Sequence, residues 1–356
     1  MDKVFLTGSG SDATESALKL ARQYFFDQDP ETPRNIIISR NRSYHGNTLG
    51  ALSVSEFTSR QTPYEGILLK NVYYVSSCYS YRQLLYGESN AEFVARKVDE
   101  LEKTFQKIGP EKVMAFIAEP ISGAALGCVS AVPGYLEAMQ KVCHKYGALF
   151  ILDEIMCGMG RTGVYHVWQR EGVTPDILMI GKGLAAGYHS IAAIMVAPHV
   201  SKALKSGEFI HGHTFDAKPT GSVAALMVHK FIKENNLLEN NQKVGYYLLQ
   251  KLKISLGDHP NVGDIRGVGL FIGIEIVKDK YTKEPFDSKL LVSERIVNLA
   301  MSSEFNMAFY PGAGSVDGVN GNHIIIAPPF TVTEQDADHI VEVISAVIIR
   351  VCNVIN

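Results

Sequence analysis

The feature that most constrains this chain is a pair of apolar runs that each end abruptly in a charged residue. The first run, Ala148–Leu152, is followed directly by Asp153, and the second, Ile177–Ile180, is followed two residues later by Lys182. Continuous apolar runs of this length are typical of strands buried on both faces, as in a parallel sheet. Ligands of open α/β sheets bind at the carboxyl ends of such strands. The pattern therefore brings an acid and an amine to one edge of one sheet.

An acid and an amine placed together in this way are what pyridoxal 5'-phosphate (PLP) requires of a protein. A lysine amine forms a Schiff base with PLP, and a carboxylate holds the pyridine nitrogen protonated so that the ring can accept electrons. Gly181 and Gly183 flank Lys182 and remove bulk where a ring must approach. The sequence therefore predicts Lys182 as the Schiff-base nucleophile and Asp153 as the partner of the ring nitrogen.

Both charged residues also have a plainer interpretation. Lys182 could be a surface lysine after a strand, and Asp153 could form a structural ion pair with Arg161. A carboxylate that closes an apolar strand is costly to bury unpaired, so it must face a cation or a protonated nitrogen. We favour the ring nitrogen for Asp153 and expect Glu154 or another acid to pair with Arg161.

Composition limits the classes of protein to consider. The 356 residues are 46% hydrophobic, which suffices for one large or two medium domains. A net charge of −3 argues against nucleic acid or an anionic membrane as a partner. The five cysteines are scattered, as in reduced intracellular proteins, and Met1–Gly8 is too short for a signal peptide, so we expect a cytoplasmic protein. The apolar run Ile340–Ile355 is interrupted by Glu342 and Arg350, which indicates an amphipathic helix.

The order of the elements predicts two domains. Strand and helix patterns alternate up to about Val228, which favours βαβ units and a parallel sheet. The expected strands are Asn35–Ser39, Val113–Ala118, Leu149–Leu152 and Ile177–Ile180, and the expected helices are Asp12–Phe26, Ala91–Lys107, Gly134–Lys145 and Val223–Asn236. Asn261–Val277 alternates and carries glycines, like antiparallel strands, and we expect helices at Leu290–Ser302 and Thr333–Val351. We expect a large domain over residues 1–236 and a small one over 237–356.

Four further segments carry residues that could bind a cofactor. The glycines of Thr7–Glu15 open the first helix, where free N–H groups suit a phosphate, although a simple serine-capped helix explains them equally. In Ser43–Asn47 an aromatic ring could stack on a flat cofactor, or the segment could be a loop with a surface histidine. Glu119 ends an apolar strand and could bond a cofactor or cap the next turn. The segment His211–Phe215 has no third metal ligand at the spacing of a metal site, so we favour a loop in which Thr214 binds a phosphate.

These segments together resemble one family over nearly the whole chain, namely the class III (omega) aminotransferases among the fold-type I PLP enzymes. The resemblance is carried, in order, by GSGSDATESALKLAR, SYHGNTLGALS, IAEPISG, LDEIMCGMGRTG, IGKGLAAGY, HGHTF, RGVGLFIGIE and APPFTVTEQD. It implies an α/β fold with a large domain built on a mostly parallel sheet and a smaller α+β C-terminal domain.

The resemblance also implies a role for one or two residues in most motifs. Gly10 and Ser11 would bind the cofactor phosphate. Tyr44 would stack on the ring with His45 beside it, and Ile155 would pack on the other ring face. Glu119 would lie near the polar edge of the ring, Asp153 would pair with the pyridine nitrogen, Lys182 would form the covalent bond, and Thr214 would reach the phosphate of the neighbouring subunit. Because Thr214 would act across an interface, the resemblance implies a homodimer. Lys182 and Asp153 would be the catalytic residues.

The sequence departs from the family pattern at several places. Members usually have several tens of residues before the GSGS motif, which begins here at Gly8. Many members pair a glutamate with an arginine that holds the substrate carboxylate, but Ala124 and the run His323–Ile326 stand at those positions. Met156 replaces a residue that is usually polar. We therefore expect a more apolar pocket and weak dependence on an α-carboxylate.

The sequence thus predicts a PLP-dependent aminotransferase that acts on an amine or ω-amino acid with a keto-acid or aldehyde acceptor. The same scaffold could instead support a decarboxylase, an aminomutase or a C–S lyase, because fold does not choose among these outcomes. A non-catalytic relic of the fold is a further alternative, and the presence of both Asp153 and Lys182 argues against it.

Overall fold

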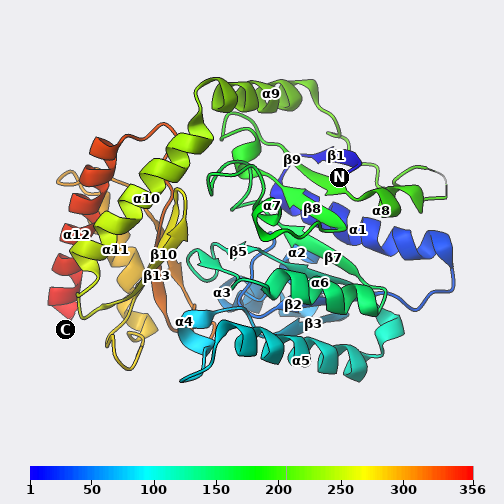
Figure 1. Ribbon diagram of the computed structural model, residues 1–356, viewed down its shortest axis with the longest axis horizontal. Coiled ribbons are helices and arrows are strands. Elements are labelled where there is room, and N and C mark those ends of the chain that lie inside the picture. The colour runs from blue at the N-terminus through cyan, green and yellow to red at the C-terminus, as the bar shows by residue number, and fades with distance from the viewer. Residues whose placement is uncertain (206, 356) are drawn as a thin grey trace.

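The computed structural model describes residues 1–205 and 207–355, and it contains two large sheets that each carry their own helices (Figure 1). The larger sheet has seven strands in the order β1-β9-β8-β7-β4-β2-β3. Their bounds are β1 Lys3–Thr7, β2 Ile36–Arg40, β3 Val72–Val75, β4 Val113–Ala118, β7 Leu149–Asp153, β8 Ile177–Ile180 and β9 Ala192–Val196. β9 runs antiparallel to both β1 and β8, and the other neighbours are parallel.

Alternating side chains of the central strands explain why helices cover both faces of this sheet. Phe116 of β4 and Phe150 of β7 belong to the core under α5 (Asn90–Ile108) and α6 (Tyr135–Lys145). Their chain neighbours Ile117 and Ile151 belong to the core under α1 (Gly10–Gln28) on the opposite face. A strand with apolar residues on both faces must be covered twice, so the apolar runs fix the three-layer arrangement seen in Figure 1.

The smaller sheet is antiparallel throughout, in the order β10-β11-β13-β12. Its strands are β10 Val262–Val268, β11 Phe271–Ile276, β12 Tyr310–Ala313 and β13 Asn322–Ile326, and its helices are α10 Leu237–Leu256, α11 Val292–Ala300 and α12 Glu334–Ile355. The helices lie on one side of this sheet (Figure 1), and their apolar faces share one core with the strands. The C-terminal segment is thus the amphipathic helix that its interrupted apolar run indicates.

The remaining elements are short or connect the two sheets. They are α2 Leu49–Val54, α3 Thr58–Gln61, α4 Ser80–Gln83, β5 Ile121–Ser122, β6 Val129–Ser130, α7 Val167–Glu171, α8 Pro198–Lys202 and α9 Pro219–Glu234. Asn236, with φ 51°, separates α9 from α10. The predicted domain division after residue 236 coincides with this junction and stays a prediction.

A buried charged cluster joins the two parts of the molecule. Glu275 of β11 is fully buried and accepts from the Tyr79 hydroxyl, from Arg82 Nε at 2.6 Å and from Arg266 Nη1 at 2.7 Å. Arg266 also donates to the carbonyl of Leu126 at 2.6 Å. A buried carboxylate without such partners would be costly, so the cluster holds the small sheet against the loop that follows β5.

The expected elements agree with the structure to within a few residues, but several others were not predicted, among them the strands β1, β3, β9, β12 and β13 and the helix α10. Val113–Ala118 and Ile177–Ile180 are strands with the predicted bounds, while the sequence analysis placed no helix where α10 runs. All five cysteines are buried free thiols. Among residues 1–205 and 207–355, none of the helices combines the length and the apolarity needed to cross a membrane.

Candidate active site

The candidate residues come together at the carboxyl ends of four adjacent parallel strands. Lys182 follows β8, Asp153 ends β7, Glu119 follows β4, and the segment with His45 follows β2. Open α/β sheets bind their ligands at this edge. The edge predicted from the two apolar runs is therefore where the chain gathers its acid, amine and imidazole groups.

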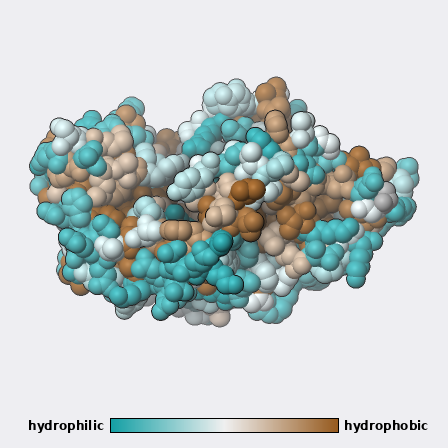
Figure 2. Space-filling model, turned by 90° about the horizontal axis from the view of Figure 1, so that it is seen from above, coloured by the Kyte–Doolittle hydropathy of each residue, from teal (hydrophilic) through white to brown (hydrophobic). Residues whose placement is uncertain are grey.

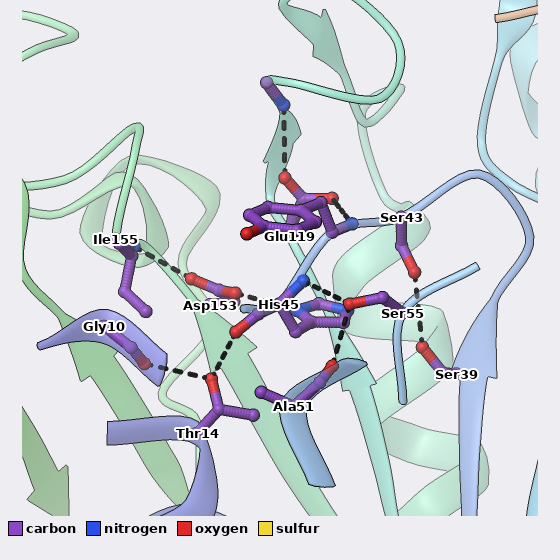
Figure 3. Close-up of polar contacts among 12 residues, drawn as sticks. Gly10, Thr14, Ser39, Ser43, His45, Ala51, Ser55, Glu119, Asp153 and Ile155 are labelled. Carbon is purple, nitrogen blue, oxygen red and sulfur yellow. Dashed lines mark hydrogen bonds and ion pairs between the residues drawn. The ribbon is translucent and has the colours of Figure 1, made fainter. Parts of the chain in front are cut away.

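Asp153 is buried and held from two sides (Figure 3). Its Oδ2 lies 2.7 Å from His45 Nδ1, and its Oδ1 accepts from the backbone N–H of Ile155 at 2.9 Å. Arg161, the alternative partner, is not among the groups bonded to Asp153 in the described part of the chain. Two fixed hydrogen bonds set the orientation of the carboxylate at the strand end.

His45 is itself fixed by the backbone around it. Its N–H donates to Ser55 Oγ at 2.8 Å, and its carbonyl accepts from Thr14 Oγ1 at 2.6 Å. The interpretation of His45 as a surface histidine is wrong, because the side chain is buried against Asp153. Its second ring nitrogen, Nε2, is buried and has no hydrogen-bond partner among the described residues.

Lys182 begins a short 3-10 turn directly after Gly181 and has a φ of 41°, in the left-handed region. Backbone strain of this kind recurs at functional sites. The side chain faces a cavity of about 1210 Å³ that is also lined by Gly8, Ser9 and Gly10. Protein atoms packed around the amine desolvate it and lower its pKa, against the opposing negative charges of Asp153 and Glu119. A lowered pKa leaves more of the amine unprotonated and nucleophilic.

Glu119 organises the loop on the other side of the site. It is buried, and its carboxylate accepts from the backbone N–H of Gly123 at 3.1 Å and of Tyr44 at 3.3 Å. Burial raises the pKa of Glu119, and the nearby Asp153 adds to that rise. Arg40, a buried residue that the sequence analysis did not single out, donates to the Glu119 carbonyl at 2.6 Å.

The start of α1 faces the same cavity. Ser9 caps the helix, and its side chain accepts from the N–H of Asp12. A Cβ on Gly10 would lie 3.0 Å from the Ile155 side chain, so glycine lets the helix start approach the end of β7 closely. Ser11 Oγ bonds Asn47, donating to Oδ1 at 2.7 Å and accepting from its N–H at 3.0 Å. The first N–H groups of a long helix, which favour an anion, therefore lie beside the end of β7 and the cavity that Lys182 lines.

The chain has clear relatives among known proteins. The class III aminotransferase family model matches residues 1–348. The chain belongs to this family.

Individual relatives agree in sequence and in fold. An aminotransferase of Gibberella zeae is 46% identical over 98% of this chain and 69% of its own length. The taurine–pyruvate aminotransferase of Bilophila wadsworthia is 34% identical over 96% of this chain and 74% of its own. The solved structure of an omega transaminase from Pseudomonas jessenii, in complex with PMP, has a TM-score of 0.91 and 32% identity over 99% of this chain and 76% of that one. The chain is therefore a PLP-dependent aminotransferase, and the predicted family, fold class and cofactor are confirmed.

The residues of this aminotransferase site fit PLP. The unpartnered Nε2 of His45 is an orphaned polar atom beside a carboxylate whose two oxygens still have acceptor capacity. The helix start at Gly10 offers N–H groups to a phosphate, and the Lys182 amine lines the same cavity. An acid, an amine and an anion-binding helix end are the three groups that PLP needs.

One expectation about the surrounding residues, an acid partner for Arg161, is changed by the structure. Glu154 does not pair with Arg161, because it accepts the backbone N–H groups of Val167 at 2.9 Å and Trp168 at 2.7 Å. Arg161 instead donates to the carbonyls of Leu270 at 3.1 Å and Pro328 at 2.6 Å. The expected acid partner was wrong because nothing in the sequence shows which backbone groups these two side chains meet.

The loop with the two histidines packs over α1. His213 Nε2 accepts from the N–H of Gly8 at 3.1 Å, and His211 Nε2 lies 3.0 Å from Ser16 Oγ. Thr214 is exposed, and within residues 1–205 and 207–355 no hydrogen bond or ion pair joins it to the other candidates. The structure thus gathers Gly10, His45, Glu119, Asp153, Ile155 and Lys182 in one place (Figure 3 shows all but Lys182), while the role of Thr214 stays a prediction.

Proposed function

We propose that this aminotransferase takes its amino group from an amine or ω-amino acid and passes it to a keto acid or aldehyde, with Lys182 and Asp153 as its catalytic residues. The observation that carries the proposal is geometric: Lys182, which lines the cavity, and Asp153, a buried carboxylate held by two hydrogen bonds, lie at the ends of adjacent strands at one edge of the sheet. Support for the donor class comes from relatives named for taurine and for omega-transaminase activity.

Asp153 would act through its negative charge. PLP, when bound, supplies an electron sink for the negative charge that develops when the amine-bearing carbon loses a proton. Asp153 would hold a proton on the pyridine nitrogen, and the bonds from His45 and Ile155 keep the carboxylate from turning away. Fixed charge placed in advance where charge develops is the most effective kind of electrostatic stabilisation.

Lys182 would act first as nucleophile and then as general acid and base. Once a substrate amine has taken its place, its free Nζ would take the proton from the amine-bearing carbon of the substrate and hold it as the conjugate acid until it is returned. A lowered pKa suits both tasks, because the amine must accept and release a proton near neutral pH.

The remaining candidates would hold the cofactor. Gly10 and Ser11 would offer backbone N–H groups to its phosphate, and Ile155 would pack on one face of its ring. Tyr44 would stack on the other face, with its backbone held by Glu119. Gly10 lines the same cavity as Lys182, which supports its role, and each of these roles can be tested by cofactor occupancy of the variant.

Product analysis separates transamination from the other outcomes of the same scaffold. The holoenzyme, incubated with an amine donor and pyruvate, is expected to form one alanine for each donor converted to its carbonyl. Release of carbon dioxide, ammonia or sulfide in place of alanine would instead identify a decarboxylase or lyase and contradict the proposal.

We expect weak dependence on an α-carboxylate. Ala124 is buried and carries no charge, and burial lowers the pKa of His323 to about 4, so this imidazole is neutral at pH 7. A bidentate arginine–carboxylate contact is charge-assisted, and a pocket without one loses that selectivity. The measurement is kcat/KM for an α-amino acid and for its decarboxylated amine. The amine should be used at least as well, and a strong preference for the α-amino acid would contradict the expectation.

We also propose that the enzyme works as a homodimer. Along α9, next to the cavity, Val223, Leu226, Met227 and Phe231 are each more than half exposed. Figure 2 shows apolar side chains around a hollow in this upper face. Exposed apolar patches of this kind mark interaction surfaces. Light scattering is expected to give twice the chain mass, and Leu226→Glu should shift the protein towards monomer, whereas an unchanged monomer mass in both would contradict the proposal.

A further inference from the structure

Arg60 is a cation next to the Tyr44 ring, and no sequence motif singles it out. It belongs to the short helix α3, and its guanidinium carbon lies 4.5 Å from the centre of the Tyr44 ring and 4.8 Å from that of Phe57. Tyr44 directly precedes His45, the partner of Asp153. Stacking against two rings fixes the plane of the guanidinium.

The same guanidinium reaches across to the small sheet. Its Nη2 donates to the Tyr310 hydroxyl of β12 at 3.2 Å. Thr58 of α3 and Gly318 also lie against each other there, since a Cβ on Gly318 would meet Thr58 Oγ1. Arg60 therefore lies where α3 meets the small sheet, beside the Tyr44 ring.

Arg60 has no acidic partner in the described part of the chain. None of the ion pairs found within residues 1–205 and 207–355 involves it, whereas other surface cations such as Arg96, Lys103 and Arg350 do form pairs. Its positive charge contributes to the lowered pKa of the Lys182 amine. An unneutralised cation that acts on the reaction centre favours an anion between the two.

We propose that Arg60 binds the acidic group of an anionic ω-amino acid substrate, at the end remote from the reacting amine. The chemistry it fits is a carboxylate or sulfonate, both of which accept hydrogen bonds from the planar guanidinium edge. This inference rests on the proposed donor class and narrows it, since neutral amines gain nothing from Arg60. It is compatible with weak recognition of α-carboxylates, because the group recognised is at the other end of the molecule.

The test compares two donors that differ only in the acid, 4-aminobutyrate and butylamine, in the holoenzyme and in Arg60→Gln. A hydrogen bond to a charged group is worth enough to change binding by roughly 10- to 150-fold. We expect Arg60→Gln to lower kcat/KM for 4-aminobutyrate by that factor, mainly through KM, and to leave butylamine within about twofold. Equal losses for both donors, or no loss for either, would overturn the proposal.

Two further variants separate anion binding from a structural role. Arg60→Lys keeps the charge and should recover part of the affinity, while Tyr310→Phe removes the contact across to β12 and should not reproduce the selective loss. Arg350→Gln, a charge change at an exposed pair with Glu304 far along the chain, is the matched control. If Tyr310→Phe has the same donor-selective effect as Arg60→Gln, the loss arises from the contact between Arg60 and Tyr310 and not from anion binding, and the proposal is wrong.

A binding measurement keeps this inference distinct from the proposed donor class. Butyrate carries the acid but no amine, so its affinity, measured by calorimetry on the holoenzyme, does not depend on turnover. Arg60→Gln should weaken butyrate binding at least about tenfold. If neither amine is transaminated but butyrate binding still depends on Arg60, the proposed donor class is wrong and the anion site stands. Equal butyrate affinity in the unaltered holoenzyme and in Arg60→Gln would overturn the anion site.

Discussion

Replacing Lys182 by alanine is expected to abolish turnover while the fold survives. The change removes the nucleophile and the proton carrier together, but it leaves β8 and the turn after it unchanged. The side chain faces a cavity rather than a packed core, so little packing is lost. The measurement is the steady-state rate together with borohydride reduction of the protein in the presence of PLP, which should no longer attach the cofactor covalently.

The control for this experiment is the same substitution at a lysine that lies away from the site. Lys103→Ala removes an exposed side chain that pairs with Asp99 one turn away and should leave turnover and covalent attachment intact. A Lys182→Ala protein that still forms a borohydride-reducible bond with PLP would point to another lysine, and the assignment would be wrong.

Asp153→Asn is expected to keep PLP bound while the rate falls by about two to four powers of ten, because losing a buried charge partner costs about 3–5 kcal/mol. The amide can still accept from the N–H of Ile155, so the end of β7 keeps its shape. It cannot hold a proton on the pyridine nitrogen. The measurement is kcat with cofactor content determined on the same sample.

A normal rate in Asp153→Asn would mean that the ring nitrogen needs no charged partner. An ion pair between Asp153 and Arg161 could not then explain the burial of the acid, because Arg161 donates to the Leu270 and Pro328 carbonyls. Asp99→Asn, a change at an exposed surface pair, serves as the matched control and should leave the rate unchanged.

The sequence predicts the fold well where a single local pattern determines the type and position of an element. An apolar run that ends in a charge favours a buried strand whose next residue emerges at the sheet edge, and both Asp153 and Lys182 lie at such a strand end. The missed helix α10 begins in Leu237-Leu238-Glu239-Asn240-Asn241, where clustered polar residues resemble a linker. Asn241 is in fact fully buried, bonding the carbonyl of Gly160 at 3.0 Å, and only tertiary structure supplies that partner.

The parts of the site that the sequence leaves open depend on contacts between distant segments. His45 meets Asp153 only because β2 and β7 lie on either side of β4, and no pattern in Ser43–Asn47 shows this. Arg60 belongs to no motif, and its contact with Tyr310 joins residues far apart in the chain. Local patterns thus identify which residues carry the chemistry, while the partners that orient them emerge only when the sheet is assembled.

The most direct test of the account is a half-reaction followed by absorbance on the PLP-loaded protein. Addition of an amine donor without a keto acid should convert the bound PLP to its pyridoxamine form, with loss of the PLP band, and a keto acid added afterwards should restore it. Lys182→Ala should not complete the cycle. A protein whose bound PLP is unchanged by a panel of amines and ω-amino acids would contradict the assignment of this site to transamination.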